Sequence, residues 1–183
     1  MNNYNKLKNN FDDIGLLTFN QTLDRYIDAV NKSEINIVDA LYAMTEKEKE
    51  FRQERVDKSM IKTAHFPFIK TFDDFDFSFQ PNISKEEILD LKNLRFIDAS
   101  ENIIFVGTSG VGKTHRATSI GIESSKNRYQ TYFITAHDLI SQLKKAQLEN
   151  TLTRRLKHFT SYSVLIIDEV GFLPISKDEA NLF

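Results

Sequence analysis

Residues 107–114, Gly-Thr-Ser-Gly-Val-Gly-Lys-Thr, fit the pattern G-x-x-x-x-G-K-[ST] of a phosphate-binding loop. Its glycines let the backbone curl without Cβ clashes, so several N–H groups can point at one phosphate. We expect Lys113 to reach the β- and γ-phosphates of a nucleotide and the Thr114 hydroxyl to bind Mg²⁺. The predicted nucleotide contacts are Gly107, Thr108, Ser109, Gly110, Val111, Gly112, Lys113, Thr114 and His115.

A second candidate lies at residues 163–169, Ser-Val-Leu-Ile-Ile-Asp-Glu. Continuous apolar runs are typical of strands covered on both faces of a parallel sheet, and ligands bind at the carboxyl ends of such strands. We expect Asp168 to hold Mg²⁺ through water and Glu169 to orient and deprotonate an attacking water. The alternative is a solvated strand end. The preceding phosphate loop and all-apolar run favour the functional interpretation.

The elements that must position these residues alternate between strand and helix. The run at 103–106, Ile-Ile-Phe-Val, predicts a buried strand directly before the loop, and helical spacing predicts a helix after it, to about residue 126. Residues 131–135 predict a second strand, residues 137–147 a helix and residues 152–159 a short basic helix. This order predicts an α/β fold with a parallel sheet and helices on both faces. The basic cluster Arg154, Arg155, Lys157 and His158 is either a solvated face or a DNA contact, and we favour the former.

Residues 1–64 predict a helical domain, because they contain no proline and only one glycine, Gly15. One apolar helix face is predicted from Val38, Leu41, Tyr42 and Thr45. Dense charges of both signs after residue 45 are typical of a solvated helix with i,i+4 pairs. The alternative is a helix that presents cations to DNA phosphates, namely Lys47, Arg52, Arg55, Lys58 and Lys62.

Residues 65–100 predict a linker and adaptor segment. Phe75, Phe77 and Phe79 alternate with polar residues, which indicates an extended stretch that packs aromatic rings on a core. Ser84, with Glu87 three residues later, predicts the N-cap of a helix running toward residue 97.

Composition narrows the class of protein. The chain has 183 residues, a formal net charge of −2 and no cysteine, so it forms no disulfide and has no thiolate chemistry. No run approaches the roughly 20 apolar residues of a membrane span, and the N-terminus lacks a signal-peptide core. We therefore expect a cytoplasmic protein with no membrane partner. The near-neutral charge means that nucleic-acid binding needs a local patch. The four histidines show no metal-ligand spacing.

Three segments together resemble the IstB-like transposition helper ATPases, which are AAA+ relatives of the replicative helicase loader DnaC. They are Gly-Val-Gly-Lys-Thr-His at 110–115, Phe-Ile-Thr-Ala-His-Asp-Leu at 133–139 and Leu-Ile-Ile-Asp-Glu-Val-Gly-Phe-Leu-Pro at 165–174. The resemblance implies a P-loop NTPase fold of the AAA+ (ASCE) type after a small all-α domain. It implies a partner- and DNA-binding domain at 1–64, a linker at 65–100 and an ATP-binding domain at 101–183.

The resemblance also implies ATP and Mg²⁺ as cofactors. Residues 107–114 match its Walker A loop, with Lys113 catalytic, and Asp168 and Glu169 match its Walker B pair. It implies homo-oligomers on double-stranded DNA that act with a transposase. Thr108 and Ser109 stand where prolines are common in the family, and Arg116 stands where an apolar residue is usual.

Family members continue past Phe183, and in the AAA+ order their next strand lies between the Walker A and Walker B strands. We therefore expect a truncated chain whose core is incomplete at its C-terminus, with weak or absent ATP hydrolysis. Two alternatives stay open beside the transposition helper. One is a helicase loader, and the other is a non-catalytic remnant that binds a partner or DNA.

Overall fold

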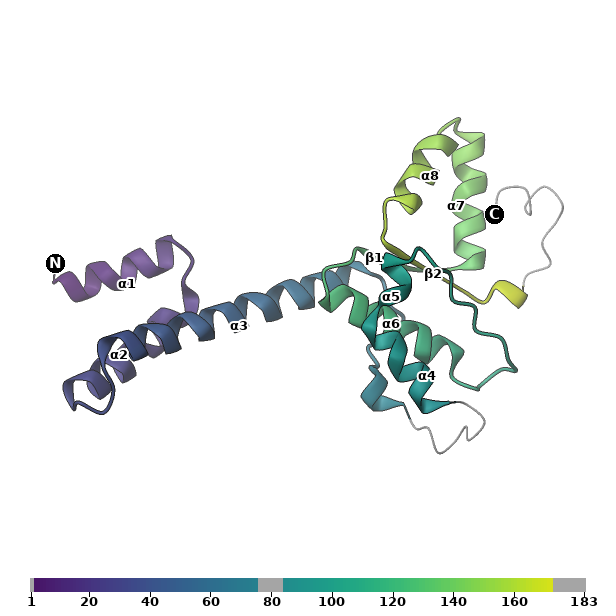
Figure 1. Cartoon of the computed structure of the whole chain (residues 1–183). Helices are drawn as coiled ribbons and strands as arrows, with labels where there is room; N and C mark the ends of the chain where they lie inside the picture. Colours follow the sequence, from purple (N-terminus) through teal and green to yellow (C-terminus); the bar gives the residue numbers. More distant parts are fainter. Residues whose placement is uncertain (1, 76–83, 173–183) are drawn as a thin grey trace. The chain divides into compact units, whose positions relative to one another are not determined.

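The computed structural model of the chain describes residues 2–75 and 84–172. Its contacts divide the chain into two compact units, Met1–Val56 and Asp57–Phe183. Figure 1 shows the elements of both units. None of the helices in these described ranges combines the length and the apolar character that crossing a membrane requires.

The first unit consists of helices: α1 (Asn3–Asp13), α2 (Leu17–Asn31) and α3 (Ile37–Thr63), the last of which continues across the division between the units. The turn between α1 and α2 contains Gly15 at φ +72°, a left-handed backbone that glycine adopts without strain. Phe19 and Leu23 of α2 and Met44 of α3 form the small buried core. The predicted helical character of the N-terminal region is therefore confirmed.

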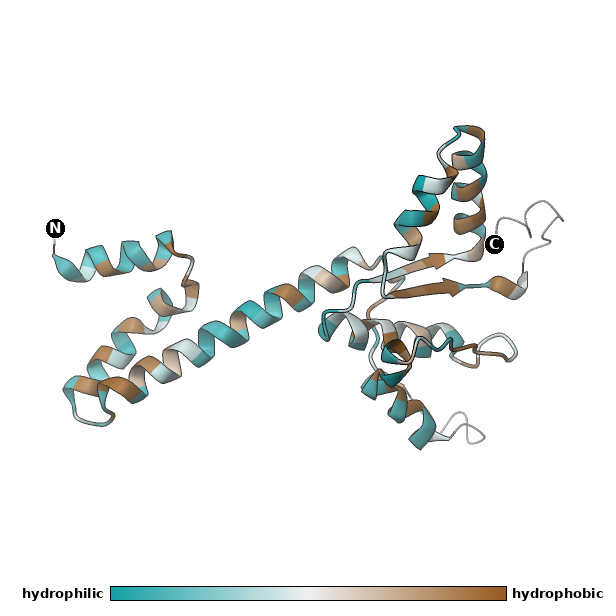
Figure 2. Cartoon of the chain, turned by 45° about the horizontal axis from the view of Figure 1, so that its top comes forward, coloured by the Kyte–Doolittle hydropathy of each residue, from teal (hydrophilic) through white to brown (hydrophobic). Residues whose placement is uncertain are grey.

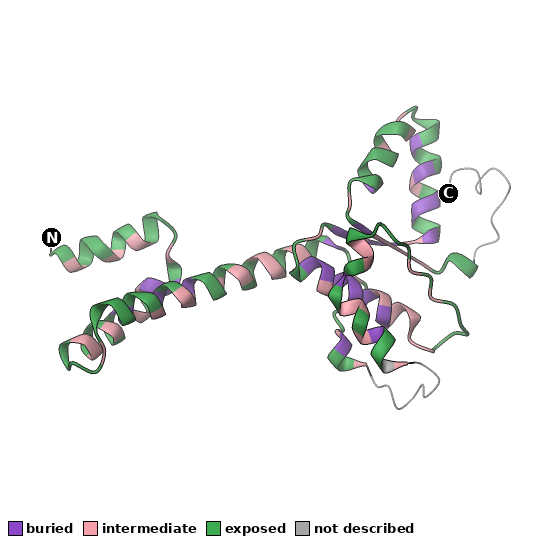
Figure 3. Ribbon diagram, in the orientation of Figure 1, coloured by how far each residue is buried: buried purple, intermediate pink, exposed green. Residues whose placement is uncertain are grey.

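The apolar face predicted for α3 is wrong. Val38 is 70% exposed and Tyr42 is 66% exposed. The buried positions of this helix are instead Ala40, Met44 and Glu48, which recur every four residues and so lie on one face. Figure 3 shows α3 as a mostly exposed and half-buried helix with few buried positions. The helical spacing of apolar residues in the sequence identified an apolar stripe on α3, but not the face of the helix that packs against α2.

The buried carboxylate of Glu48 joins α3 to the start of α2. It accepts hydrogen bonds from the backbone N–H of Thr18 at 3.0 Å and from its hydroxyl at 2.7 Å. Its other oxygen accepts from Nε of Arg52 at 2.8 Å. The N-cap residue of α2, Leu16, has no side chain that can cap the helix. Glu48 therefore acts as the cap from a neighbouring helix, where a negative charge also complements the helix dipole.

The second unit contains both strands of the described chain. Its elements are η1 (Phe72–Asp74), α4 (Lys85–Asp90), η3 (Leu91–Asn93), α5 (Arg95–Asp98), α6 (Lys113–Lys126), β1 (Thr131–Thr135), α7 (Ala136–Leu148), α8 (Leu152–Thr160), β2 (Val164–Asp168) and η4 (Val170–Phe172). Ser84 caps α4 as predicted, since its Oγ accepts from the N–H of Glu87 at 3.2 Å. The single helix predicted toward residue 97 is wrong, because Leu94 at φ +55° interrupts it.

Strands β1 and β2 are parallel, and Thr131 pairs with Val164 while Thr135 pairs with Asp168. Parallel strands need a crossover connection, which α7 and α8 provide. The predicted strand at 131–135 is thus confirmed, and the one predicted at 163–169 forms over Val164–Asp168. Figure 2 shows both as hydrophobic. The sheet has helices on both faces, with α6 on one and α7 and α8 on the other, as Figure 1 shows.

Alternation along the strands explains these two faces. Tyr132, Ile134, Leu165 and Ile167 pack with the buried residues of α7 and α8. Ile166 points the other way, toward Gly121 of α6, where an added Cβ would lie 2.6 Å from Ile166 Cδ1. The absence of a side chain at Gly121 therefore allows α6 to lie close against β2.

The strand predicted at residues 103–106 is not formed. No backbone hydrogen bond within residues 2–75 and 84–172 involves this segment, and Val106 is 88% exposed. A strand needs a neighbour to pair its N–H and C=O groups, and β1 is instead bonded to β2 and to Ala64, whose carbonyl accepts from the Phe133 N–H at 2.8 Å. Phe77 and Phe79, and the Leu-Pro of the family motif at 173–174, lie outside the described residues.

Candidate nucleotide-binding site

The predicted phosphate loop leads directly into the first turn of α6. Gly110 and Gly112 adopt left-handed backbone conformations, at φ +81° and +83°. Gly112 is the N-cap residue of α6, and a Cβ there would lie 2.7 Å from Cε2 of Phe75. Both conformation and space therefore demand glycine at position 112. Thr108 and Ser109 are exposed at the tip of the loop.

The ammonium group of Lys113 folds back onto this loop. It donates to the carbonyl oxygen of Gly107 at 2.8 Å and to that of Thr108 at 2.7 Å. An ammonium group has three N–H donors, so these bonds leave one for another acceptor. The loop thereby holds a positive charge beside its own exposed backbone.

The loop and the end of β2 meet through Thr114 and Asp168. The Thr114 hydroxyl donates to Oδ2 of Asp168 at 2.8 Å, although 54 positions separate the two residues. The structure thus brings together the residues that the sequence predicts as metal ligands. Both are half-buried oxygen donors, the type that Mg²⁺ prefers.

Glu169 follows Asp168 in a left-handed backbone conformation, φ +62°. Its N–H donates to Oδ1 of Asp168 at 2.9 Å, and its side chain is exposed. A glutamate in this region stores about 1 kcal/mol or more of backbone strain, a feature that clusters at functional sites. The strained turn takes Glu169 out of the regular strand, which ends at Asp168.

His115 turns away from the loop toward residues 68–75. Its Nε2 lies 3.0 Å from the carbonyl oxygen of Thr71, and its ring packs edge-on against Phe75 at 5.2 Å between centroids. Ser119, one turn later, donates to the Lys70 carbonyl at 3.1 Å. These bonds fasten the segment before η1 onto α6, so that His115 positions this segment beside the loop.

Comparisons with known proteins decide the family. The family described as "IstB-like ATP binding protein" matches residues 10–183. The chain belongs to this IstB-like family. It is 47% identical over 182 residues to the ATP-binding protein named for insertion sequence IS232 of Bacillus thuringiensis subsp. berliner. That alignment covers 100% of this chain and 73% of the relative.

Two further relatives are named as ATP-binding proteins of insertion sequences. The IS5376 protein of Geobacillus stearothermophilus is 44% identical over 80% of this IstB-like chain and 59% of its own length. The IS21 protein of Pseudomonas aeruginosa is 37% identical over 88% of the chain and 61% of its own length. The chain therefore spans about three fifths of the length of these two relatives.

Arg116 of the IstB-like chain is a site residue whose position the sequence did not reveal. Its side chain is buried, at 7% exposure, beside the loop. The sequence signal was only its departure from the apolar residue usual in the family. The structure shows that an arginine fits there because aromatic rings and backbone carbonyls surround its guanidinium group.

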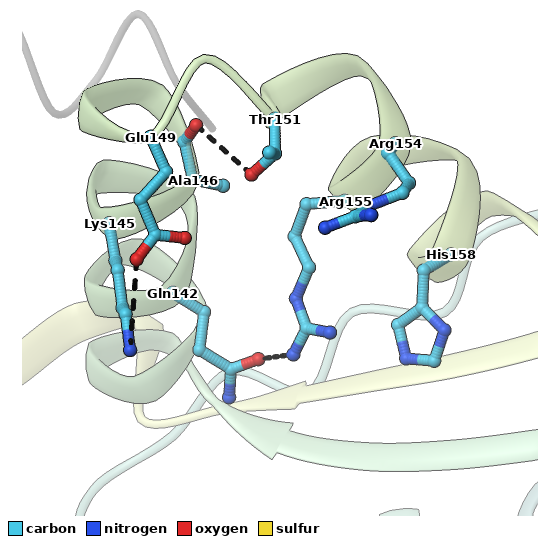
Figure 4. Close-up of a pocket in the computed structure, with 8 residues that line it drawn as sticks. All are labelled: Gln142, Lys145, Ala146, Glu149, Thr151, Arg154, Arg155 and His158. Atoms are coloured by element: carbon cyan, nitrogen blue, oxygen red, sulfur yellow. Dashed lines mark hydrogen bonds and ion pairs between the residues drawn. The ribbon is translucent and has the colours of Figure 1, made fainter.

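The basic residues predicted as DNA contacts lie in different settings. On α3, Arg52 donates to Glu48 and to the Gly15 carbonyl, so it contributes to the packing of the first unit. On α8, Arg154, Arg155 and His158, but not Lys157, line a groove of 520 Å³ between α7 and α8, which Figure 4 shows. Its lining residues are Gln142, Lys145, Ala146, Glu149, Thr151, Arg154, Arg155 and His158.

Proposed function

We propose that this IstB-like chain binds Mg-ATP through residues 107–114 and Asp168, and that it serves DNA transposition as an ATP-dependent helper. The observation that carries the proposal is the 2.8 Å hydrogen bond between Thr114 and Asp168, which unites loop and strand in one oxygen-donor site. The glycine conformations of the loop and the position of Lys113 support it. The family description and the names of the relatives point the same way.

The residues present fit the cofactor. Mg²⁺ typically takes one or two protein oxygens together with waters and phosphates, and the Thr114 hydroxyl and Asp168 carboxylate supply such a pair. When bound, the ion neutralises charge on the phosphates. Lys113 places its remaining N–H on a phosphate oxygen, and the loop N–H groups surround the anion. Glu169 holds the attacking water and accepts its proton.

Two substitutions test these roles. Lys113→Ala should abolish ATP binding, whereas Glu169→Gln should keep binding and stop turnover, because the amide cannot accept the proton. Lys126→Ala, at an exposed position on the same helix, is the matched control for the lost charge. Calorimetric titration gives binding and phosphate release gives turnover. Equal turnover by wild type and Glu169→Gln would exclude Glu169 from catalysis.

For the fold we propose a P-loop arrangement of the AAA+ type built on the parallel strands β1 and β2 and on α6, to which residues 103–106 contribute no strand in the described structure. The order of β1 and β2 and the packing of α6 on β2 support it. The unpaired state of residues 103–106 favours a second candidate function, ATP binding without efficient hydrolysis. Robust turnover by purified residues 1–183 would exclude this second candidate.

The partners we propose are a transposase, double-stranded DNA and further copies of this chain. A pull-down with the transposase against one with the replicative helicase separates the helper from the helicase loader. For DNA, the groove between α7 and α8 supplies the supporting cations. Arg155 is held by Gln142 and lies 4.8 Å from the Phe159 ring, whereas Arg154 makes no hydrogen bond or ion pair with the described residues.

Arg154 is accordingly the cation to test. Arg154→Ala should weaken duplex binding equally for all sequences and reduce the slope of log K against log salt by about 1, since one phosphate contact is lost. Fluorescence anisotropy with a labelled duplex at several salt concentrations measures this. Arg95→Ala, outside the groove, serves as the matched control. An unchanged slope would remove the groove from the DNA interface.

A further inference from the structure

Arg116 lies one turn into α6 with its guanidinium group directed at the phosphate loop. Its Nε donates to the Gly112 carbonyl at 3.3 Å and its Nη2 to the Val111 carbonyl at 3.4 Å. The guanidinium carbon lies 5.1 Å from the ring centroid of Phe105 and 5.8 Å from that of Phe75. Arg116 thus contacts Phe105 before the loop, Val111 and Gly112 at the end of the loop, and Phe75.

No carboxylate among the described residues balances the charge of Arg116. Within residues 2–75 and 84–172, no acidic side chain forms an ion pair with it. Burial lowers the pKa of Arg116 from its ordinary value, but an arginine stays protonated at neutral pH. The cation is therefore stabilised by carbonyl dipoles and by the faces of aromatic rings.

The two carbonyl bonds fix the direction of two N–H groups. In a trans peptide the C=O and the following N–H point in opposite directions. Holding the Val111 carbonyl toward Arg116 therefore turns the Gly112 N–H away from it. The Gly112 carbonyl, which also accepts the backbone N–H of Arg116 at 3.0 Å, is held by both bonds and directs the Lys113 N–H in the same way. These are loop N–H groups of the kind that cradle phosphate.

We propose that Arg116 is a positioning residue of the phosphate loop, which orients the Gly112 and Lys113 N–H groups before the nucleotide arrives. This inference rests on the proposed ATP site. Orientation in advance removes part of the ordering cost of binding, so Arg116 raises affinity for ATP. It also lowers stability, because it buries a charge that no carboxylate among the described residues pairs with.

The test compares Arg116→Met and Arg116→Lys in the full chain. Methionine keeps an unbranched apolar side chain between the rings and removes the charge and both bonds. Lysine keeps the charge but not the planar fork that reaches two carbonyls. Lys126→Met, an exposed position on the same helix, controls for the net charge. The probe is a fluorescent methylanthraniloyl-ATP with Mg²⁺, and the second readout is the melting temperature without nucleotide.

We expect Arg116→Met to bind the probe roughly tenfold more weakly and Arg116→Lys a few-fold more weakly, with melting temperatures equal to or above that of wild type. A merely structural residue would instead lower the melting temperature along with affinity. The inference is overturned by that result, by Arg116→Met binding within twofold of wild type, or by Arg116→Lys binding as wild type does. If wild type itself does not bind the probe, the proposed ATP site fails first and the inference fails with it.

Discussion

Replacing Glu48 tests whether the first unit depends on a buried carboxylate. The side chain is 4% exposed and accepts the N–H and hydroxyl of Thr18 and the Nε of Arg52. Glu48→Gln can keep its amide oxygen on Thr18, but its NH₂ group then faces the Arg52 donor. One charge-assisted bond is lost and the others become neutral, so we expect a destabilisation of about 2 kcal/mol.

Glu48→Ala removes all three bonds and leaves the buried N–H of Thr18 without its cap. We expect a cost of about 3 kcal/mol, the lower end of the range for breaking a buried charged pair, because Arg52 stays half-exposed and can be hydrated. The matched control is Glu46→Gln, which removes the same charge from the exposed pair with Lys49. That variant should change stability by no more than about 0.5 kcal/mol.

The stability that Glu48 contributes should depend on pH. Burial raises the pKa of Glu48, but the hydrogen bonds from Thr18 and the charge of Arg52 outweigh it, and the net pKa lies below the ordinary value. A depressed pKa contributes stability that is fully present above the unfolded value, about 4.3, and is lost as pH falls through the folded value. Wild type and Glu48→Gln should therefore differ most at pH 7 and converge only as the pH falls below the unfolded value and through the lowered pKa of the folded state.

Urea unfolding followed by circular dichroism at 222 nm measures these differences, because all elements of the first unit are helical. The midpoint should fall for Glu48→Gln and Glu48→Ala and stay in place for Glu46→Gln. If Glu48→Gln matched wild type at pH 7, or if their difference grew at acid pH, the capping argument would be refuted.

Two further substitutions follow from packing and from the site. Gly121→Ala places a Cβ 2.6 Å from Ile166 and from Phe66, so it should lower stability by about 1 kcal/mol even after the gain in helix propensity, measured by thermal melting. Thr114→Val should weaken nucleotide binding in Mg²⁺ and leave binding in EDTA within about twofold, since the hydroxyl acts on the metal; equal losses in both buffers would contradict that role.

The local geometry of residues 107–114 could be predicted because the motif encodes it. The spacing of Gly107, Gly112, Lys113 and Thr114 sets a loop followed by a helix, and the structure has both. Asp168 was predicted beside them because parallel strands end at one edge of a sheet, and its bond to Thr114 bears out that proximity.

The buried face of α3 and the pairing of residues 103–106 could not be predicted, because each depends on contacts with residues distant in sequence. Val38 and Tyr42 show helical apolar spacing, yet Glu48 is buried instead because Thr18, 30 residues earlier, supplies its donors. Residues 103–106 have the composition of a strand, but no described strand pairs with them. Local propensity indicates which secondary structure a segment can form, but it does not determine which distant segment packs or pairs with it.

Because residues 103–106 form no strand, the site is held in place by other contacts. In the described structure α6 is fixed from two other sides: Gly121 lets it contact β2, Thr114 bonds to the end of that strand, and Ser119 bonds to Lys70. Because these contacts act on the helix that carries Lys113, the loop keeps its geometry while residues 103–106 form no backbone hydrogen bond with the described residues. We therefore expect ATP binding to depend on the packing of α6 more than on residues 103–106.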